Sequence, residues 1–415
     1  FFKIKVTLSA QSTLVLGLVI LLVGLAAISA ALIKAFLERL SLPAVVGYII
    51  LGFCIRLFDT ELNFLTEQTE QTIDFLAYVG VTVLLFRVGM ESQLHNLLNQ
   101  LGKASIIGLT CIAVSGTIGF VFTYWLINLG LLTSLIVGTA LTATSVGMVA
   151  AVWEKSGAIK TNEGQLLLDV AELDDIMGVV LMALLFNVAP VITAHNMQAI
   201  GGTLLKTGGI FAVKLILFGL LCTLFALYLE KPLMRFFQRF EKPPELTLLV
   251  VSIGFVIASV AGLLGFSLAI GAFFAGLIFS RDPSSNKSRI AFDIIYDLFV
   301  PFFFIGIGLG IRLENLASAL GLAGILMLAA FVGKFLGSTA PSLVCQGWKP
   351  SVLLGISMIP RAEIAMIITQ RSKTLAKDAM PGSVFAAMVI TCLATCILPP
   401  ILLKRAIPRW IKNVR

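Results

Sequence analysis

The sequence predicts an all-helical polytopic membrane protein with about 13 transmembrane helices. Two observations support this prediction: the amino-acid composition and the length of the apolar runs. Hydrophobic residues make up 58% of the 415 residues and charged residues only 13%, whereas a soluble domain carries about 25% charged residues. Runs of roughly 20 apolar residues recur along the chain, and each can cross about 30 Å of hydrocarbon as a helix. The runs lack the apolar–polar alternation of barrel strands, so the spans are helices.

Thirteen candidate spans follow from these runs, and those at 43–56 and 246–261 are short for a bilayer. The candidate spans are 13–37, 43–56, 72–90, 104–128, 131–153, 163–188, 207–229, 246–261, 265–280, 293–311, 318–345, 351–370 and 382–403.

Basic residues in the connections predict the orientation, because Lys and Arg concentrate on the cytoplasmic side. This rule favours an N-terminus outside and a C-terminus inside a plasma (inner) membrane. The strongest inside signal is the basic tail of Lys404, Arg405, Arg409, Lys412 and Arg415. The outward segment with Arg371, Lys373 and Lys377 departs from the rule. The net charge of +8 does not indicate nucleic-acid binding, because the basic residues lie between apolar runs and not along one face.

No residue pattern indicates an enzyme. His95 and His195 fall in predicted loops, without a Ser-His-Asp arrangement or metal-ligand spacing. The six cysteines lie in or beside apolar runs without paired CxxC spacing, which is typical of packing cysteines. We therefore expect no catalytic residues and no cofactor.

Four acids lie in the span at 163–188, which contains Asp169, Glu172, Asp174 and Asp175. A charge near the bilayer centre costs at least about 2.5–3.5 kcal/mol, so these acids need partners, water or protons. Asp174 and Asp175 point about 100° apart on a helix and can face different partners. Asp169, Glu172 and Asp175 are spaced by three and share a face. Structural pairing with basic residues is the alternative for all four, and Asp169 could simply border a water-filled vestibule.

A positive charge lies in the span at 318–345, where Lys334 stands near the middle of LAAFVGKFLGS. A lone buried ammonium requires a carboxylate partner.

The span at 351–370 contains Pro360, Arg361 and Glu363 in SMIPRAEIAMII. A proline in mid-span breaks a helix and frees backbone carbonyl groups, which is tolerated where the backbone is buried or lines a cavity. Arg361 and Glu363 are two residues apart, so they point in different directions and could bridge the two ends of the broken helix. We expect a structural role for this charged pair.

The span at 131–153 carries small hydroxyl residues at mid-depth, in GTALTATSVGMVAAV. Close helix packing is one interpretation of Thr142, Thr144 and Ser145, and a second broken helix whose ends face an ion is the other. The fifth and twelfth spans then carry irregular motifs at matching places in two sets of six, joined by one linker span. Because one span links the two sets, the second set has the opposite orientation in the membrane to the first. Paired broken segments at matching places in two such sets indicate a transporter site.

TATSVG, LDDIMG, GKFLG and IPRAE occur in this order over most of the chain. In these motifs the chain resembles sodium/proton antiporters of the NapA and GerN type, in the second branch of the monovalent cation–proton antiporter superfamily. The resemblance implies inverted repeats of six helices joined by one linker helix, with crossed discontinuous helices. It divides the chain into dimerisation-domain helices 1–3 at 1–103, core helices 4–6 at 104–206, linker helix 7 at 207–245, dimerisation-domain helices 8–10 at 246–317, and core helices 11–13 with the basic tail at 318–415.

The resemblance also implies roles for individual residues. Asp175 matches the ion-binding aspartate of the family, and Asp174 matches the aspartate that pairs with the lysine, here Lys334. Thr144 lies in the ion-site motif, so Asp175 and Thr144 would hold Na⁺ or K⁺. Asp169 and Glu172, which we treat as accessory acids, and Arg87 in LLFRVGME depart from the small or apolar residues usual there.

The expected activity is exchange of Na⁺ or K⁺ for protons. Burial disfavours ionisation of a carboxyl group, so one such group can hold either a proton or a cation, and rocking of the core carries whichever is bound. If Lys334 releases Asp174 and its own proton, the exchange is electrogenic; if the pair is structural, stoichiometry is set elsewhere. The resemblance implies a homodimer. The alternative is a Kef-like gated potassium efflux protein, whose family typically has QD and GGEFAF at these places, and whose regulatory cytosolic domain would lie outside this chain.

Overall fold

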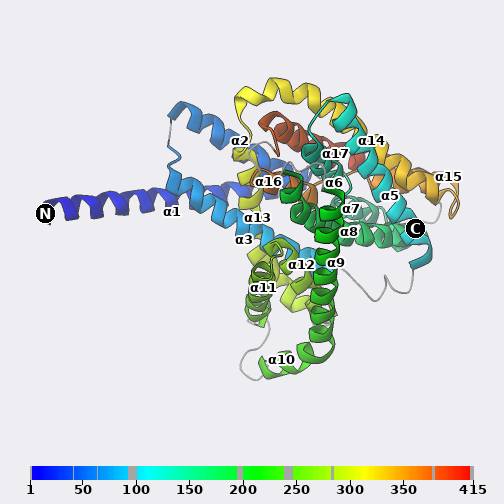
Figure 1. Ribbon diagram of the computed structural model, residues 1–415, viewed down its shortest axis with the longest axis horizontal. Helices are drawn as coiled ribbons and strands as arrows, with labels where there is room; N and C mark the ends of the chain where they lie inside the picture. The colour runs from blue at the N-terminus through cyan, green and yellow to red at the C-terminus, as the bar shows by residue number, and fades with distance from the viewer. Residues whose placement is uncertain are drawn as a thin grey trace.

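The computed structural model describes residues 2–40, 42–62, 64–91, 101–193, 200–237, 246–281, 285–375 and 379–411, and every regular element in these ranges is a helix. His95, His195, Lys377 and the end of the basic tail from residue 412 lie outside the described residues. Helix α1 (Phe2–Arg39) projects from the body of the molecule, with the N-terminus at its far end (Figure 1).

Each of the thirteen predicted spans corresponds to one helix or to one interrupted pair. In the first half these are α1, α2 (Ala44–Leu62), α3 (Glu67–Glu91), α5 (Leu101–Val121), the pair α6 (Leu131–Ala140) and α7 (Val146–Lys155), and α8 (Asn162–Thr193). After α9 (Ile200–Leu224) and the short α10 (Glu230–Phe237) come α11 (Leu246–Leu263), α12 (Leu268–Ile278), α13 (Ser285–Leu309), α14 (Leu316–Ser342), the pair α15 (Trp348–Ser357) and α16 (Glu363–Ser372), and α17 (Gly382–Trp410).

Eight of the described helices are long and apolar enough to cross a membrane, which makes the chain a multi-pass membrane protein. The other predicted spans are α2, which has 19 residues, the shorter apolar helices α11 and α12, and the two interrupted pairs, whose halves have ten residues each.

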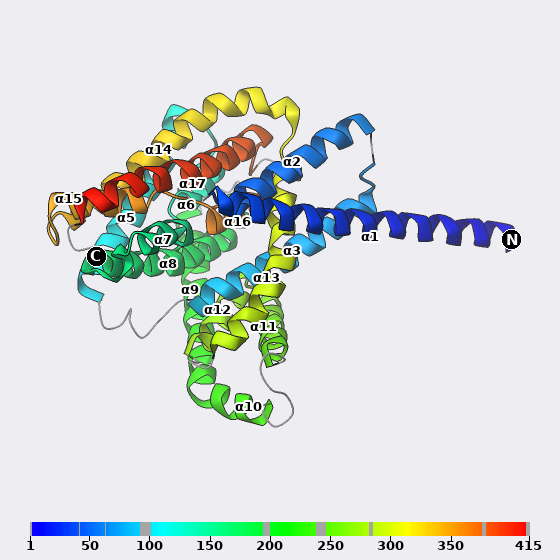
Figure 2. The same ribbon diagram turned by 180° about the vertical axis from the view of Figure 1, so that it is seen from behind.

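The helices pack as two bundles. In the first bundle, α3 lies against α12 and α13, while α13 also packs on α2, and α1 and α11 join them. In the second bundle, α14 packs against α5, α15 and α17, and α8 packs against α5 and both interrupted pairs. The long helices α14 and α17 run side by side across one face of the molecule (Figures 1 and 2). Helix α9 contacts α8 of the second bundle and α12 of the first.

Glycines allow α5 and α14 to approach closely. A Cβ atom on Gly333 would lie 2.9 Å from the Cα of Ser115, and one on Gly337 would lie 2.9 Å from the Cα of Cys111. Real Cβ atoms do not come so near to backbone, so a side chain at either glycine would push the two helices apart. Small residues at helix contacts serve close packing inside membranes, and here they hold the helix that carries Lys334 against α5.

Two spans are interrupted for different local reasons. Between α15 and α16, Pro360 offers no N–H group and disfavours helical geometry at the residue before it. Between α6 and α7, both the hydroxyl and the backbone N–H of Thr142 donate to the carbonyl of Thr139, at 2.7 and 3.1 Å, so the chain ends α6 in a tight turn. Pro190 and Pro301 lie inside continuous helices, so proline alone does not predict where a span breaks.

Candidate ion-binding site

The two interrupted segments cross and bond to one another in the second bundle. The backbone N–H of Ser145 donates to the carbonyl of Pro360 at 2.8 Å. The hydroxyl of Thr144 donates to the carbonyl of Met358 at 3.1 Å. Each contact satisfies a backbone group that a helix break leaves open, so the two breaks stabilise each other.

Arg361 completes the crossing with its side chain. The fully buried guanidinium donates to the carbonyl of Ala143, in the other break, and to the carbonyl of Ala330 on α14, both at 3.1 Å. Among the described residues no ion pair joins Arg361 to Glu363, and the structural role that we expect for this charged pair stays a prediction. Backbone carbonyl groups of the other break and of α14 hold the guanidinium, while Glu363, the first residue of α16, lines a cavity.

Lys334 and Asp174 form a buried ion pair. The ammonium group of Lys334 lies 2.7 Å from the carboxylate of Asp174, and both side chains are 0% exposed. The second oxygen of Asp174 has no hydrogen-bond partner among the described residues. The pair joins α14 to α8, and it commits one of the two adjacent aspartates to a protein partner.

Asp175 faces a cavity of about 460 Å³, unlike its neighbour. Thr144 and Ser145 of the crossing and Glu363 of α16 line the same cavity. No Lys or Arg among the described residues forms an ion pair with Asp175. The spacing of the adjacent aspartates on one helix therefore separates a paired carboxylate from one that faces open space.

Glu172 and Asp169 line the same cavity, about one and two helical turns before Asp175 on α8. The spacing of three residues predicted this shared face. One oxygen of Asp169 is buried without a hydrogen-bond partner among the described residues. The three acids form a negatively charged wall that leads along α8 toward the crossing, an arrangement that attracts cations.

The opposite wall of the cavity comes from the first bundle, where sequence analysis singled out only Arg87. The guanidinium of Arg87 lies 2.8 Å from Glu91 and 3.3 Å from Asp293, and it stands 4.4 Å from the ring centre of Tyr296. Leu84, Arg87, Glu91 and Tyr296 all line the cavity. The charge of Arg87 is thus shared among residues of α3 and α13.

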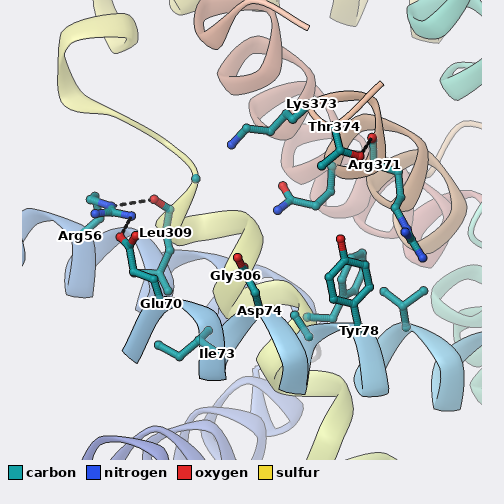
Figure 3. Close-up of a pocket in the computed structure, with 15 residues that line it drawn as sticks. Arg56, Glu70, Ile73, Asp74, Tyr78, Gly306, Leu309, Arg371, Lys373 and Thr374 are labelled. Carbon is teal, nitrogen blue, oxygen red and sulfur yellow. Dashed lines mark hydrogen bonds and ion pairs between the residues drawn. The ribbon is translucent and has the colours of Figure 1, made fainter. Parts of the chain in front are cut away.

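A second cavity, of about 280 Å³, lies between the other ends of α3 and α16 (Figure 3). In Figure 3 the Arg371 side chain, from the end of α16, approaches Tyr78 of α3, and its guanidinium is 4.6 Å from the ring centre. Arg56 pairs with Glu70 at 2.9 Å and donates to the carbonyl of Leu309 at 2.8 Å in the same view. None of the acids of α8 lines this cavity.

The arrangement can bind a hard cation, since carboxylate and hydroxyl side chains line one cavity inside a membrane protein. A family model described as "Sodium/hydrogen exchanger, transmembrane" matches residues 14–405. The chain belongs to this family. A sodium/hydrogen exchanger is a transporter and not an enzyme.

Relatives of this exchanger are similar over most of their length. The chain is 27% identical to the high-affinity Na⁺/H⁺ antiporter NhaS3 of Synechocystis sp., over 80% of this chain and 70% of that protein. It is 26% identical to the Na⁺/H⁺–K⁺ antiporter GerN of Bacillus cereus, over 88% of this chain and 90% of that one. The solved structure of the sodium proton antiporter MjNhaP1 from Methanocaldococcus jannaschii at pH 8 has the same fold, with a TM-score of 0.73 at 16% identity over 96% of this chain and 99% of that one.

Several residues of the exchanger's cavities escaped sequence analysis. Tyr296 lies on the far wall and Asp293 pairs with Arg87 beside it, and the approach of both to Arg87 depends on how α3 packs against α13. Tyr78 meets Arg371 across nearly three hundred residues of sequence. The sequence signal that could have predicted this wall is the charge of Arg87, because a charged residue in an apolar span needs partners near it.

Proposed function

We propose that this exchanger moves a small monovalent cation, Na⁺ or K⁺, in one direction and protons in the other, and that Asp175 holds each in turn. The observation that supports this is the contrast between the two adjacent aspartates: Asp174 is paired with Lys334, whereas Asp175 faces the cavity beside Thr144. A single carboxylate cannot hold a proton and a metal ion together, so the two compete for one site. Ionised and empty, it would carry an uncompensated charge across an apolar barrier, which is costly.

The transport step is a movement of the second bundle against the first, as an elevator or rocking motion. Two cavities lie at opposite ends of the boundary between α3 and α16, and Asp175 lines only one of them. A shift of α8 and the crossing along α3 would transfer Asp175 from one cavity to the other. In this proposal the second bundle is the core that carries the ion, and the first bundle is the dimerisation domain.

We further propose that exchange is electrogenic, with more than one proton moved per cation. Lys334 lies on α14 beside the acid pair, so a cation at Asp175 could draw Asp174 away from the ammonium, which then releases a proton. In proteoliposomes, an imposed interior-negative potential should accelerate proton uptake coupled to cation exit. Proton flux that is insensitive to the potential would leave the salt bridge with a structural role only.

The choice of cation rests on oxygen ligands, which suit either Na⁺ or K⁺. Names of the relatives support both, since NhaS3 is named for Na⁺ and GerN for Na⁺ and K⁺. The acids Asp169 and Glu172 serve as accessory groups that concentrate cations at the mouth of the site. We place the protein in the plasma (inner) membrane as a homodimer, with the N-terminus outside and the C-terminus in the cytoplasm.

A cation-jump assay tests the proposed exchange. The full chain is reconstituted in proteoliposomes with an internal pH dye, and Li⁺, Na⁺, K⁺ or Rb⁺ is added outside. We expect a pH change that saturates with Na⁺, K⁺ or both and is lost in protein-free vesicles. K⁺ flux that follows the membrane potential without any proton movement would replace antiport by a channel-like activity.

A further inference from the structure

Glu363 is an acid at the position where the two interrupted spans meet. It is the first residue of α16 and lines the same cavity as Asp175. Within the part of the chain that the structure describes, no Lys or Arg forms an ion pair with it, because Arg361 is occupied by the carbonyl groups of Ala143 and Ala330. Its side-chain partner is Ser145, the residue before α7, which donates a hydrogen bond to it.

A purely structural role accounts poorly for this placement. A carboxylate at the N-terminus of a helix gains from the helix dipole and from the free N–H groups of the first turn. That gain is small beside the cost of placing a charge, even a half-buried one, inside a membrane protein without an ion-pair partner. Glu91, another acid of the same cavity, is paired with Arg87 at 2.8 Å. Glu363 and Asp175 therefore share one feature: each lines the cavity, and neither forms an ion pair with a Lys or Arg in the described ranges.

We propose that Glu363 is a second carboxylate of the cation site, which holds the transported cation together with Asp175. This inference rests on the proposed exchange. The two carboxylates approach from different elements, α8 and the start of α16, and the hydroxyls of Thr144 and Ser145 lie between these elements at the crossing. A cation bound there supplies the charge that both carboxylates lack.

A second carboxylate also sets which cation binds best. Ligands of high field strength favour a small cation, which offsets its larger dehydration cost, whereas a weaker field favours a larger cation. Two carboxylates beside one site create a strong field. Removing the charge of Glu363 should therefore weaken binding of Na⁺ more than binding of K⁺, and the selectivity of the exchanger should move toward K⁺.

The test compares Glu363→Gln with wild type in proteoliposomes and in detergent, and the matched control is Glu154→Gln, an exposed acid on α7. We expect Glu363→Gln to raise the KM for Na⁺ by about tenfold or more, as losses at metal sites do, with a smaller rise for K⁺. Without cations its apparent Tm should equal or exceed that of wild type, and the rise in Tm that Na⁺ produces should be lost. Glu154→Gln should behave as wild type.

An unchanged KM and an unchanged preference between Na⁺ and K⁺ would overturn the inference. So would a fall in Tm of the same size with and without Na⁺, which is what a helix-end role predicts. If Glu363→Gln does not fold, Glu363→Asp decides the question, because it keeps the charge on a shorter side chain and should alter the ratio of the two KM values. If wild type exchanges normally and both Glu363→Gln and Glu363→Asp match it, this inference is wrong but the proposed function stands. If wild type shows no cation-driven proton flux, the proposed function itself is wrong.

Discussion

Asp174 and Asp175 are neighbours on α8, and their surroundings are opposite. Asp174 is fully buried against Lys334 at 2.7 Å, while Asp175 lines a cavity. A buried ion pair carries a large desolvation cost, which the partners offset only together. Removing one partner should therefore lower the folding stability more than removing both. This difference can be measured directly by comparing single and double variants.

Lys334 and Asp174 should behave as one coupled unit in thermal unfolding. Lys334→Gln and Asp174→Asn each leave an uncompensated buried charge, which typically costs about 3–5 kcal/mol, so each should lower the apparent Tm in detergent. The double variant has neither charge and should recover much of the lost stability, so the single effects will not add. Strictly additive losses of Tm would show that the two groups do not stabilise each other.

At the scale of the element, the crossing depends on backbone groups that two helix breaks expose. Its stability comes from the contacts of Ser145 with Pro360 and of Thr144 with Met358, and from Arg361. The guanidinium is suited to this place because its donors diverge in a plane and reach carbonyl groups on two different segments. An ammonium group has one nitrogen atom and cannot lie close to both carbonyls.

Arg361→Lys should therefore destabilise the protein although it keeps the charge. One of the carbonyl groups of Ala143 and Ala330 would lose its donor, and a buried unsatisfied group costs about 1–3 kcal/mol. We expect a lower apparent Tm than for wild type. Arg405→Lys, on the exposed side of α17, is the matched control and should leave the Tm unchanged. If the two variants melt alike, Arg361 does not hold the crossing together.

The elements were predictable where a single span carries the signal. Apolar run length located a helix or an interrupted pair at each of the thirteen predicted segments, and the spacing of Asp169, Glu172 and Asp175 predicted their shared wall. The pairing of Arg361 was not predictable, because its partners are backbone carbonyls of Ala143 and Ala330, which every residue possesses and no sequence pattern marks. Proline also gave an ambiguous signal, since Pro360 stands in a break but other prolines lie inside helices.

At the scale of the whole molecule, the two cavities stand at opposite ends of the boundary between the bundles. Tyr78 belongs to the first bundle and Arg371 to the second, and they meet at 4.6 Å in the cavity that lacks the acids of α8 (Figure 3). Transport by relative movement of the bundles requires this contact to open. If the two bundles kept a fixed arrangement, the contact between Tyr78 and Arg371 could stay closed during transport.

Cross-linking Tyr78→Cys to Arg371→Cys with a short, reducible thiol reagent should stop exchange, and reduction should restore it. The matched control is the pair Ala77→Cys and Gly306→Cys, both in the first bundle, where a Cβ on Gly306 would lie 3.5 Å from that of Ala77. This control pair should cross-link without loss of exchange. Full activity with Tyr78 and Arg371 positions joined would rule out movement of α16 along α3.

Contacts between the bundles could not be predicted from the sequence. The position of Tyr78 in an apolar span gives no indication that it faces Arg371 of the second bundle. Within the first bundle, likewise, the grouping of Asp293 and Tyr296 around Arg87 depends on the packing of α13 against α3. Such contacts follow from tertiary packing, whereas spans and shared helix faces follow from local periodicity. The site within the second bundle was accordingly better anticipated than the walls that the first bundle provides.

The most direct test of the account is cation-driven proton flux by Asp175→Asn in proteoliposomes, at protein density matched to wild type. An asparagine cannot alternate between a proton and a metal ion, so we predict that exchange is abolished while size-exclusion behaviour and apparent Tm show a folded protein. Glu154→Gln serves as the exposed control and should exchange normally. Near wild-type flux from Asp175→Asn would contradict the account, because the proton and the cation would then be carried by a group other than Asp175.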